Sequence, residues 1–352
     1  MKICYVNLDG YGLLNEKFKQ PYGGAEVALN TDAHELAKDS QFDVHLLVNA
    51  DEEQTFRKNR LTVWMLKGTQ HNTTLGTIAT CVRKFWKKLS QINADVYLMR
   101  AGAGELYLLT ALFCKTNGKK YVQTLGILPQ KHAYNGIAKF ARWSVAIKTA
   151  LRMADAIIAL SHDQIEQLRP LLRKKTQVIY TGKRLTGRKH PKRKYFLWAG
   201  RGRQEKRALF FAQLAEKLAD KRFVMIGTML SNPPKNLQCI KEVPNEQMNK
   251  YYSNAIATIS MSELEGFSNV YLESWNNGTP VIALEVDTDS AIKKHNLGYH
   301  SGTIEQLITD IKKIQHKKVW LRKSQNSSRY VRENHDLKKQ IEKYKQLFRE
   351  LK

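Results

Sequence analysis

Short apolar runs alternate with amphipathic segments along almost the whole chain. The apolar runs are typical of strands, and the segments between most of them have the periodicity of helices. In the first half, the predicted strands are KICYVNL, FDVHLLVNA, RLTVWML, ADVYLMR, KYVQTLG, ADAIIALS and TQVIYTG. The predicted helices of this half cover 25–38, 75–91, 104–116 and 136–153. This alternation predicts an α/β fold with a doubly wound parallel sheet.

A polar, basic stretch, GKRLTGRKHPKRK at 182–194, interrupts the pattern and is predicted to be an exposed linker. A second series follows, with predicted strands YFLWAG, RFVMIGT, LQCIKEV, IATISMS and PVIALEV. Its predicted helices cover 206–220, 245–253, 269–276, 303–316 and 337–351. Because 352 residues exceed the length at which one core usually stops growing, we expect two α/β domains, 1–182 and 183–336. Ligands usually bind at the carboxyl ends of such strands and between such domains.

The charge of the chain indicates an anionic partner. Its 58 Lys and Arg residues outnumber 32 Asp and Glu residues, for a net charge of +26. Nucleic acid, an acidic membrane surface and phosphorylated substrates all fit this excess, although a solvated basic surface explains much of it. The four scattered cysteines form no CxxC pair, and no signal peptide or membrane-spanning run is visible. These features predict a reduced, cytoplasmic protein without structural zinc.

Two glutamates flank a Gly-Phe-Ser-Asn turn in the segment 263–280. Ser268 is predicted to cap a helix that starts near Asn269, and Gly278 to end it. The positive end of that helix attracts anions, which Glu265 and Glu273 would repel. A sugar joined to a nucleoside through a diphosphate could bind to the helix end and to both acids. Glu273 would bind the ribose diol, and Glu265 would lie beside the sugar. The alternative is that both acids are ordinary charges near a helix start, and spacing alone does not separate the two interpretations.

The loop AGRGRQEKR at 199–207 follows a predicted strand and places Arg201 and Lys206 at its carboxyl end. Arginine can bind a phosphate through two hydrogen bonds, and lysine supplies a point charge. Basic residues are so frequent in this chain that a solvated loop is the competing interpretation of this segment alone.

Four segments together resemble one enzyme family. ELEGFSNVYLE resembles the E-x7-E element of the retaining glycosyltransferases of family four (group 1), and NNGTPVIA resembles its continuation. YGGAE, FLWAGRGRQEK and YVRENHDLKKQIEKYKQLFREL resemble further elements of that family in the same order. The resemblance implies the GT-B fold, in which two Rossmann-like domains face each other across a cleft. It also implies that the C-terminal helix, 337–352, completes the first domain.

The resemblance also implies roles for individual residues. Arg201 and Lys206 would bind the diphosphate and stabilise its charge as the glycosidic bond breaks. Glu273 would hold the ribose hydroxyls, and Glu265 would lie beside the donor sugar. The other implied donor-binding residues are Gly266, Phe267 and Ser268 at the sugar hydroxyls, and Asn269 and Val270 at the distal phosphate. Gly23 and Gly24 would let the backbone of the first domain approach the phosphate or the acceptor.

The implied activity is retaining transfer of a sugar from a nucleotide diphosphate sugar to a glycan or a lipid-linked acceptor, in the synthesis of a cell-surface polysaccharide or lipopolysaccharide. A UDP-sugar is favoured on frequency alone. No metal and no other cofactor are expected, because two fixed cations and a helix N-terminus can stabilise the leaving group. The Asp287-Thr288-Asp289 sequence resembles a metal motif of another glycosyltransferase fold and is discounted. Ser161-His162-Asp163 is interpreted as a helix cap.

One departure from the family concerns a histidine expected after the strand KYVQTLG. Leu125 or Gly126 stands there, and His132 has no assignable place in the cleft. The departure favours one alternative to an active enzyme of the usual kind, a catalytically lapsed scaffold. A basic nucleic-acid-binding protein is a second alternative, which rests on the net charge and on the basic run at 169–207. No nucleic-acid-binding motif supports the second alternative.

Two basic amphipathic segments, 81–89 and 139–152, carry aromatic residues among their lysines and arginines. Such helices can lie in an anionic membrane interface. Phe85 and Leu89 are expected to pack on the sheet instead, and both interpretations hold if only the helix ends contact lipid. They suggest a cytoplasmic protein that is peripheral on the inner face of the membrane.

Overall fold

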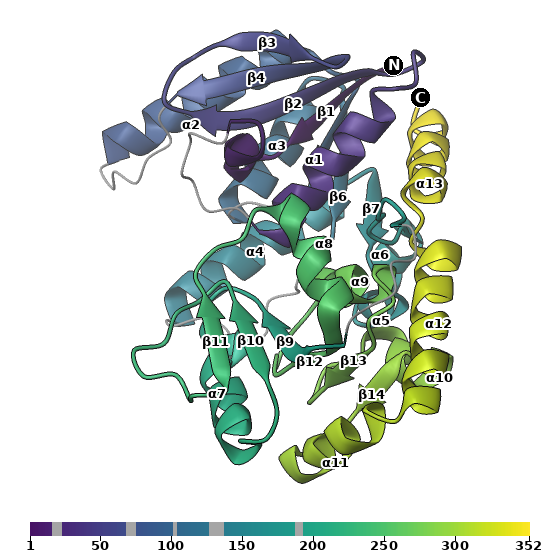
Figure 1. The fold of residues 1–352 in the computed structure, drawn as a ribbon. Helices are drawn as coiled ribbons and strands as arrows, with labels where there is room; N and C mark the ends of the chain where they lie inside the picture. Colours follow the sequence, from purple (N-terminus) through teal and green to yellow (C-terminus); the bar gives the residue numbers. More distant parts are fainter. Residues whose placement is uncertain (16–22, 68–74, 101–103, 127–136, 187–192) are drawn as a thin grey trace. The chain divides into compact units, whose positions relative to one another are not determined.

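A computed structural model describes residues 1–15, 23–67, 75–100, 104–126, 137–186 and 193–352 (Figure 1). The chain forms two compact units. Unit 1 comprises Met1–Gly182 and Leu337–Lys352, and unit 2 comprises Lys183–Asp336. Among the helices of the described residues, none combines the length and the apolar character needed to cross a membrane.

The described residues of unit 1 form an eight-stranded sheet in the order β3-β4-β2-β1-β5-β6-β7-β8. All neighbouring strands are parallel except β3 and β4. The chain moves in one direction across the sheet from β1 and in the other from β5, so the predicted doubly wound fold is confirmed. The strands are β1 (Lys2–Val6), β2 (Asp43–Ala50), β3 (Thr55–Lys58), β4 (Leu61–Lys67), β5 (Val96–Met99), β6 (Lys120–Thr124), β7 (Ala156–Ala159) and β8 (Thr176–Val178).

Strand β3 was not predicted. It forms a hairpin with β4 through Asn59 and Arg60, whose φ angles are 50° and 68°. Two consecutive positive φ values are the geometry of the tight hairpin turn that follows the twist of antiparallel strands. The strand is short and mostly exposed, so its sequence carries little apolar signal.

The helices of unit 1 cover its sheet, and α13 closes the core. Ile341, Tyr344 and Phe348 of α13 are buried in the same apolar cluster as Ile3 and Val44 of the sheet. Figure 1 shows α13, in yellow, beside this part of the unit. The helices are α1 (Gly24–Leu36), α2 (Leu75–Ile92), α3 (Gly104–Thr116), α4 (Ile137–Met153), α5 (His162–Glu166), α6 (Pro170–Arg173) and α13 (Leu337–Glu350).

The sheet of unit 2 has six parallel strands in the order β11-β10-β9-β12-β13-β14. The order reverses between β9 and β12, which again is a doubly wound arrangement (Figure 1). The strands are β9 (Tyr195–Ala199), β10 (Phe223–Ile226), β11 (Leu237–Ile240), β12 (Ala255–Ser260), β13 (Val281–Ala283) and β14 (Gly298–His300). The helices are α7 (Ala208–Lys217), α8 (Asn245–Asn254), α9 (Asn269–Asn276), α10 (Ala291–His295), α11 (Ile304–Ile314) and α12 (Lys317–Asn334).

The prediction for the end of unit 2 was incomplete, because β14, α10 and α12 were not predicted. Helix α12 is long but rich in Ser, Asn, Lys and Arg, and one of the positions on its buried face is a lysine. A polar residue on the buried face weakens the apolar periodicity from which a helix is predicted.

The interpretation of 182–194 as exposed linker holds in part: the boundary between the two units lies between Gly182 and Lys183, and Arg184 and Leu185 are exposed. Residues 187–192 lie outside the described residues. Gly182 is buried, and a Cβ at this position would lie 2.9 Å from Cα of Leu337. Thr186 Oγ1 donates a hydrogen bond of 2.7 Å to the carbonyl of Asn276, and Asn276 Nδ2 donates one of 2.8 Å to the carbonyl of Arg184. These contacts attach the stretch to the end of α9.

Lys323 of α12 is a buried cation, only 4% exposed. Its ammonium donates to Oδ1 of Asn296 (2.5 Å) and to the carbonyl of Gly298 (2.6 Å), and it lies 3.9 Å from the ring centroid of Tyr299. Burial, assisted by the charge of Arg322, lowers the pKa of Lys323 to about 8 although Asp310 opposes the shift. The loss of hydration therefore outweighs these contacts.

This pKa predicts a pH-dependent stability. Between the folded pKa near 8 and the higher pKa of an unfolded lysine, the unfolded chain binds more protons, so the free energy of unfolding rises with pH. We expect wild type to gain roughly 1–2 kcal/mol relative to Lys323→Met between about pH 7.5 and 9.5. Urea unfolding of both proteins across this range measures the difference. Parallel pH profiles for the two proteins would contradict it.

Candidate functional site

The candidate site of unit 2 lies at the carboxyl edge of its sheet, where the strand order reverses between β9 and β12. Ligands of open α/β sheets bind at such reversals. The loop 200–207 follows β9 and carries Arg201 and Lys206. The loop 261–268 follows β12 and leads into α9, which carries Glu273. All predicted site residues of unit 2 thus follow two adjacent strands.

Close backbone contact shapes the first of these loops. Gly227, after β10, has a φ of +99°, and a Cβ there would lie 2.3 Å from the carbonyl oxygen of Gly200. The loop then turns through a short 3-10 helix, η3 (Gln204–Lys206), and the indole of Trp198 donates to the carbonyl of Lys206 at 3.3 Å. The backbone that carries Lys206 is therefore attached to the end of β9.

Lys206 and Glu265 contact each other directly. The ammonium of Lys206 donates to Oε1 of Glu265, and the two side chains are 23% and 10% exposed. The residue predicted to bind phosphate and the acid predicted to face the sugar therefore form an ion pair. Burial raises the pKa of the Tyr271 hydroxyl, and the charge of Glu265 adds to this shift.

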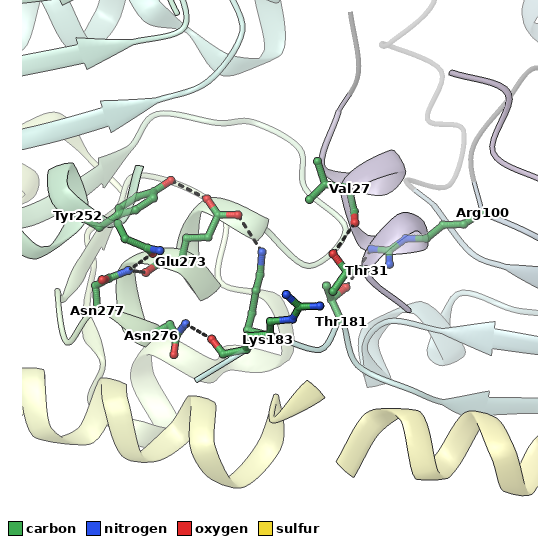
Figure 2. Close-up of polar contacts among 11 residues, drawn as sticks. Val27, Thr31, Arg100, Thr181, Lys183, Tyr252, Glu273, Asn276 and Asn277 are labelled. Carbon is green, nitrogen blue, oxygen red and sulfur yellow. Dashed lines mark hydrogen bonds and ion pairs between the residues drawn. The ribbon is translucent and has the colours of Figure 1, made fainter. Parts of the chain in front are cut away.

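Glu273 is held by two donors that were not predicted. Lys183 Nζ donates to its Oε1 at 2.8 Å, and the Tyr252 hydroxyl donates to its Oε2 at 3.0 Å. Figure 2 shows both donors reaching the carboxylate from different elements. Burial and the adjacent Glu273 raise the pKa of Tyr252, so its hydroxyl keeps its proton. Lys183 lies in the stretch interpreted as linker, where no local pattern distinguishes it from the other basic residues.

Helix α9 begins at Asn269 as predicted, and Gly278, with a φ of +70°, follows its end. The predicted side-chain cap was wrong. Ser268 occupies the N-cap position, yet within the described part of the chain its hydroxyl makes no capping hydrogen bond. The first amides of a helix have no partner inside it, and Asn269 and Val270 supply the first two here. An anion could receive these amides without displacing a serine cap.

The turn before α9 is attached on both sides. The carbonyl of Gly266 accepts a 2.8 Å hydrogen bond from Thr288 Oγ1. The Phe267 ring is buried, with its centroid 6.5 Å from that of Trp275 and 4.8 Å from that of His335. The side chain of Phe267 is therefore part of the core, and only its backbone is available to a ligand.

Arg207, which was not predicted, joins three loops. It pairs with Glu263, which follows β12, and with Glu285, which follows β13. Partial burial opposes its charge, but the hydrogen bonds to Glu285 and Glu263 raise the pKa of Arg207. Its φ of +49° lets it end η3 and begin α7. The only indication in the sequence was its position next to Lys206, and the many other basic residues of this loop kept it from standing out.

Gly23 and Gly24 lie in unit 1, at the start of α1. Gly23 N donates to Oε2 of Glu26 at 2.6 Å, and its φ of −115° is open to any residue. Neither glycine has a positive φ, so the predicted need for glycine would come only from a close approach.

Leu125 and Gly126, which stand where the family's histidine was expected after β6, have structural roles. Leu125 is buried, and the carbonyl of Gly126 accepts a 2.9 Å hydrogen bond from Gln164 Nε2. His132 lies outside the described residues.

The two discounted motifs have structural roles. The carboxylate of Asp287 accepts hydrogen bonds from the amides of Ile292 (2.7 Å) and Lys293 (3.2 Å), in the first turn of α10. Ser161 Oγ accepts one from the amide of Gln164 at 3.2 Å, so the predicted cap of α5 is confirmed.

The basic segment 81–89 packs on the sheet of unit 1 through Phe85 and Leu89, as expected. Trp86 packs edge-on against Phe113, with the ring centroids 5.2 Å apart. In the second segment, Leu151 is buried, while the side chains of Phe140 and Trp143 lie outside the described residues.

Comparison with known proteins gives one family match, within the second unit. Residues 193–316 match the family described as Glycosyl transferases group 1. The match lies within unit 2 and makes this part of the chain similar to the group 1 glycosyl transferases. No curated protein matches the chain by sequence.

Solved structures establish the fold of the whole chain. Sucrose-phosphate synthase from Thermosynechococcus elongatus superposes with a TM-score of 0.80 at 16% identity, covering 100% of this chain and 99% of that one. The Anabaena protein HepE in complex with UDP-glucose gives 0.74 at 14% identity, covering 99% and 100%. A glycosyltransferase from Rickettsia africae gives 0.69 at 16% identity, covering 99% and 98%. These chains share the GT-B fold, and the predicted fold is confirmed.

The contacts of Arg207 predict a local effect of its removal. Glu263 and Glu285 are about half exposed, so we expect Arg207→Met to lower the free energy of unfolding by no more than about 1 kcal/mol. Amide hydrogen exchange in 200–206 and 263–268 should accelerate, because the three loops are no longer joined. The matched control is Arg203→Met, an exposed arginine of the same loop. Equal exchange in both variants would show that the ion pairs do not order the loops.

Proposed function

We propose that this chain is a retaining glycosyltransferase that uses a nucleotide diphosphate sugar, preferably a UDP-sugar, without a metal or other cofactor. The observation that carries the proposal is the grouping of Arg201, Lys206, Glu265 and Glu273 on segments that follow β9 and β12, beside the uncapped start of α9. The group 1 family match of unit 2 supports it, and so does a similar structure that holds UDP-glucose.

The chemistry requires stabilisation of a diphosphate leaving group. Arg201 and Lys206 supply positive charge, and the first amides of α9 supply hydrogen-bond donors, all fixed before the reaction. Lys206 has three N–H donors, so it can keep its hydrogen bond to Glu265 while it donates to a phosphate oxygen. Glu265 would then lie beside the donor sugar, whose anomeric carbon becomes oxocarbenium-like. An acceptor that attacks from the face of the leaving group retains the configuration.

The remaining predicted donor contacts follow the same scheme. Glu273 holds the ribose diol, and the backbone of Gly266, Phe267 and Ser268 faces the sugar hydroxyls. The amides of Asn269 and Val270 meet the distal phosphate. Gly23 and Gly24 would let the backbone at the start of α1 approach the phosphate or the acceptor closely.

For the acceptor, we propose a glycan or a lipid-linked glycan of a cell-surface polysaccharide or lipopolysaccharide. The net charge of +26 supports an acceptor at an anionic membrane surface, on its cytoplasmic side. The free cysteines, two of them buried, support a reducing compartment.

The test is donor turnover by purified full-length protein in the presence of a metal chelator. We expect hydrolysis or transfer of a UDP-sugar, and we expect Arg201→Ala, Lys206→Ala and Glu273→Ala each to lower kcat/KM by about 10²-fold or more. Arg203→Ala, which removes an exposed charge from the same loop, serves as control. Full activity in the three variants would disprove the site, and activity that requires added metal would disprove the metal-free mechanism.

Two binding measurements separate the alternatives. A nucleic-acid-binding protein would bind DNA or RNA with an affinity that falls steeply with salt. A lapsed scaffold would bind none of a panel of nucleotide sugars. For an enzyme, a donor present at about 100 times its Kd should stabilise the fold by about 2.7 kcal/mol in a thermal-shift screen.

A further inference from the structure

Each acid of the candidate donor site has its own lysine partner. Lys206 pairs with Glu265, and Lys183 pairs with Glu273. We propose that Lys183 is a positioning and specificity-determining residue, which orients Glu273 for a ribose diol and offsets its charge toward the diphosphate. The proposal rests on the proposed function and adds to it a residue that none of the recognised motifs contains.

The backbone of Lys183 is held in place before any ligand arrives. Its amide donates a 2.7 Å hydrogen bond to the carbonyl of His335, and the residue forms a β-bridge with Asp336. The following residues are attached to the end of α9 by the hydrogen bonds of Arg184 and Thr186 with Asn276. The helix that carries Glu273 and the segment that carries Lys183 are therefore bonded to each other, so only the Lys183 side chain remains to be ordered when the pair forms.

The carboxylate of Glu273 can accept further hydrogen bonds, and their number follows from the two that it already accepts. A carboxylate can accept about four hydrogen bonds, two on each oxygen. Lys183 takes one on Oε1 and Tyr252 takes one on Oε2. Counting the donors of the described residues, one position then remains on each oxygen. Figure 2 shows the two donors bonded to different oxygens, and this restricts rotation of the carboxylate. A vicinal diol, with one O–H for each oxygen, fits this arrangement, whereas a 2′-deoxyribose fills only one position.

The charge of Lys183 addresses the repulsion between Glu273 and a diphosphate. Glu273 lies in α9, close to the helix start that is proposed to bind phosphate. An unpaired carboxylate there would oppose that binding. The Lys183 and Glu273 side chains are 14% and 23% exposed, so water screens the pair only partly and the pair presents no net charge to the anion.

A purely structural ion pair is the competing explanation, since Lys183 also attaches the 182–186 stretch to α9. The two roles differ in what they change. A structural role changes thermal stability and lowers the affinity for every nucleotide equally. A positioning role also changes the preference for ribose over 2′-deoxyribose, because it decides whether both diol hydrogen bonds can form at once.

The experiment is calorimetric titration of the full-length chain with UDP, GDP and ADP and with their 2′-deoxy counterparts. We expect wild type to prefer the ribonucleotide. Lys183→Met should weaken ribonucleotide binding by about 10-fold and reduce the ribose preference to within about 2-fold, since one correct hydrogen bond contributes about 1 kcal/mol or more. Lys183→Arg should restore most of the preference. Lys250→Met, which removes an exposed lysine of α8, should match wild type.

Each outcome decides the matter. If wild type binds a nucleotide and Lys183→Met keeps the ribose preference, the role of Lys183 is overturned while the donor site stands. If wild type binds none of the nucleotides, the proposed function and the inference fall together. If Lys183→Met lowers the thermal midpoint strongly, Lys183→Gln and Tyr252→Phe carry the test, because each removes one contact to Glu273 and keeps a similar volume. An unchanged preference in both would also refute the inference.

Discussion

The pairing of each site carboxylate with a lysine is the interaction on which the candidate site depends. Two acids near the positive end of a helix would by themselves exclude the anion that this end attracts. Lys206 on Glu265 and Lys183 on Glu273 remove that conflict while leaving hydrogen-bond capacity on both carboxylates. The cations come from the loop after β9 and from the segment that begins unit 2, so the pairing requires the completed sheet.

The sheet topology explains why these particular segments meet. In unit 2 the order β11-β10-β9-β12-β13-β14 makes β9 and β12 neighbours although more than fifty residues separate them, and their following loops leave the same edge. Arg207 then joins the loops after β9, β12 and β13 through Glu263 and Glu285. Phe267 holds the intervening turn in the core. The turn before α9 is thus held by apolar packing and the three loops by ion pairs, and the groups proposed to meet the ligand extend from them.

The basic charge of the chain has more than one use. Arg207 and Lys206 are paired with acids at the sheet edge, and Lys323 is buried under α12 at the expense of part of its proton affinity. Net charge alone therefore does not report how many cations face an anionic partner. The pairing of individual side chains in the folded chain decides that.

The sequence by itself determined the fold class, most element positions and the segments that form the candidate site. Apolar periodicity carries this information because strands and helices bury residues at different spacings, and the helix at 269–276 was predicted to the residue. It did not indicate α12, whose buried face includes Lys323, or β3, whose hairpin is mostly exposed. Only the tertiary structure showed that Lys183, Tyr252 and Arg207 hold the site and that Ser268 is not a cap. These contacts join residues that lie 21 to 90 positions apart, and they could not be predicted from local propensity, which depends only on residues close in sequence.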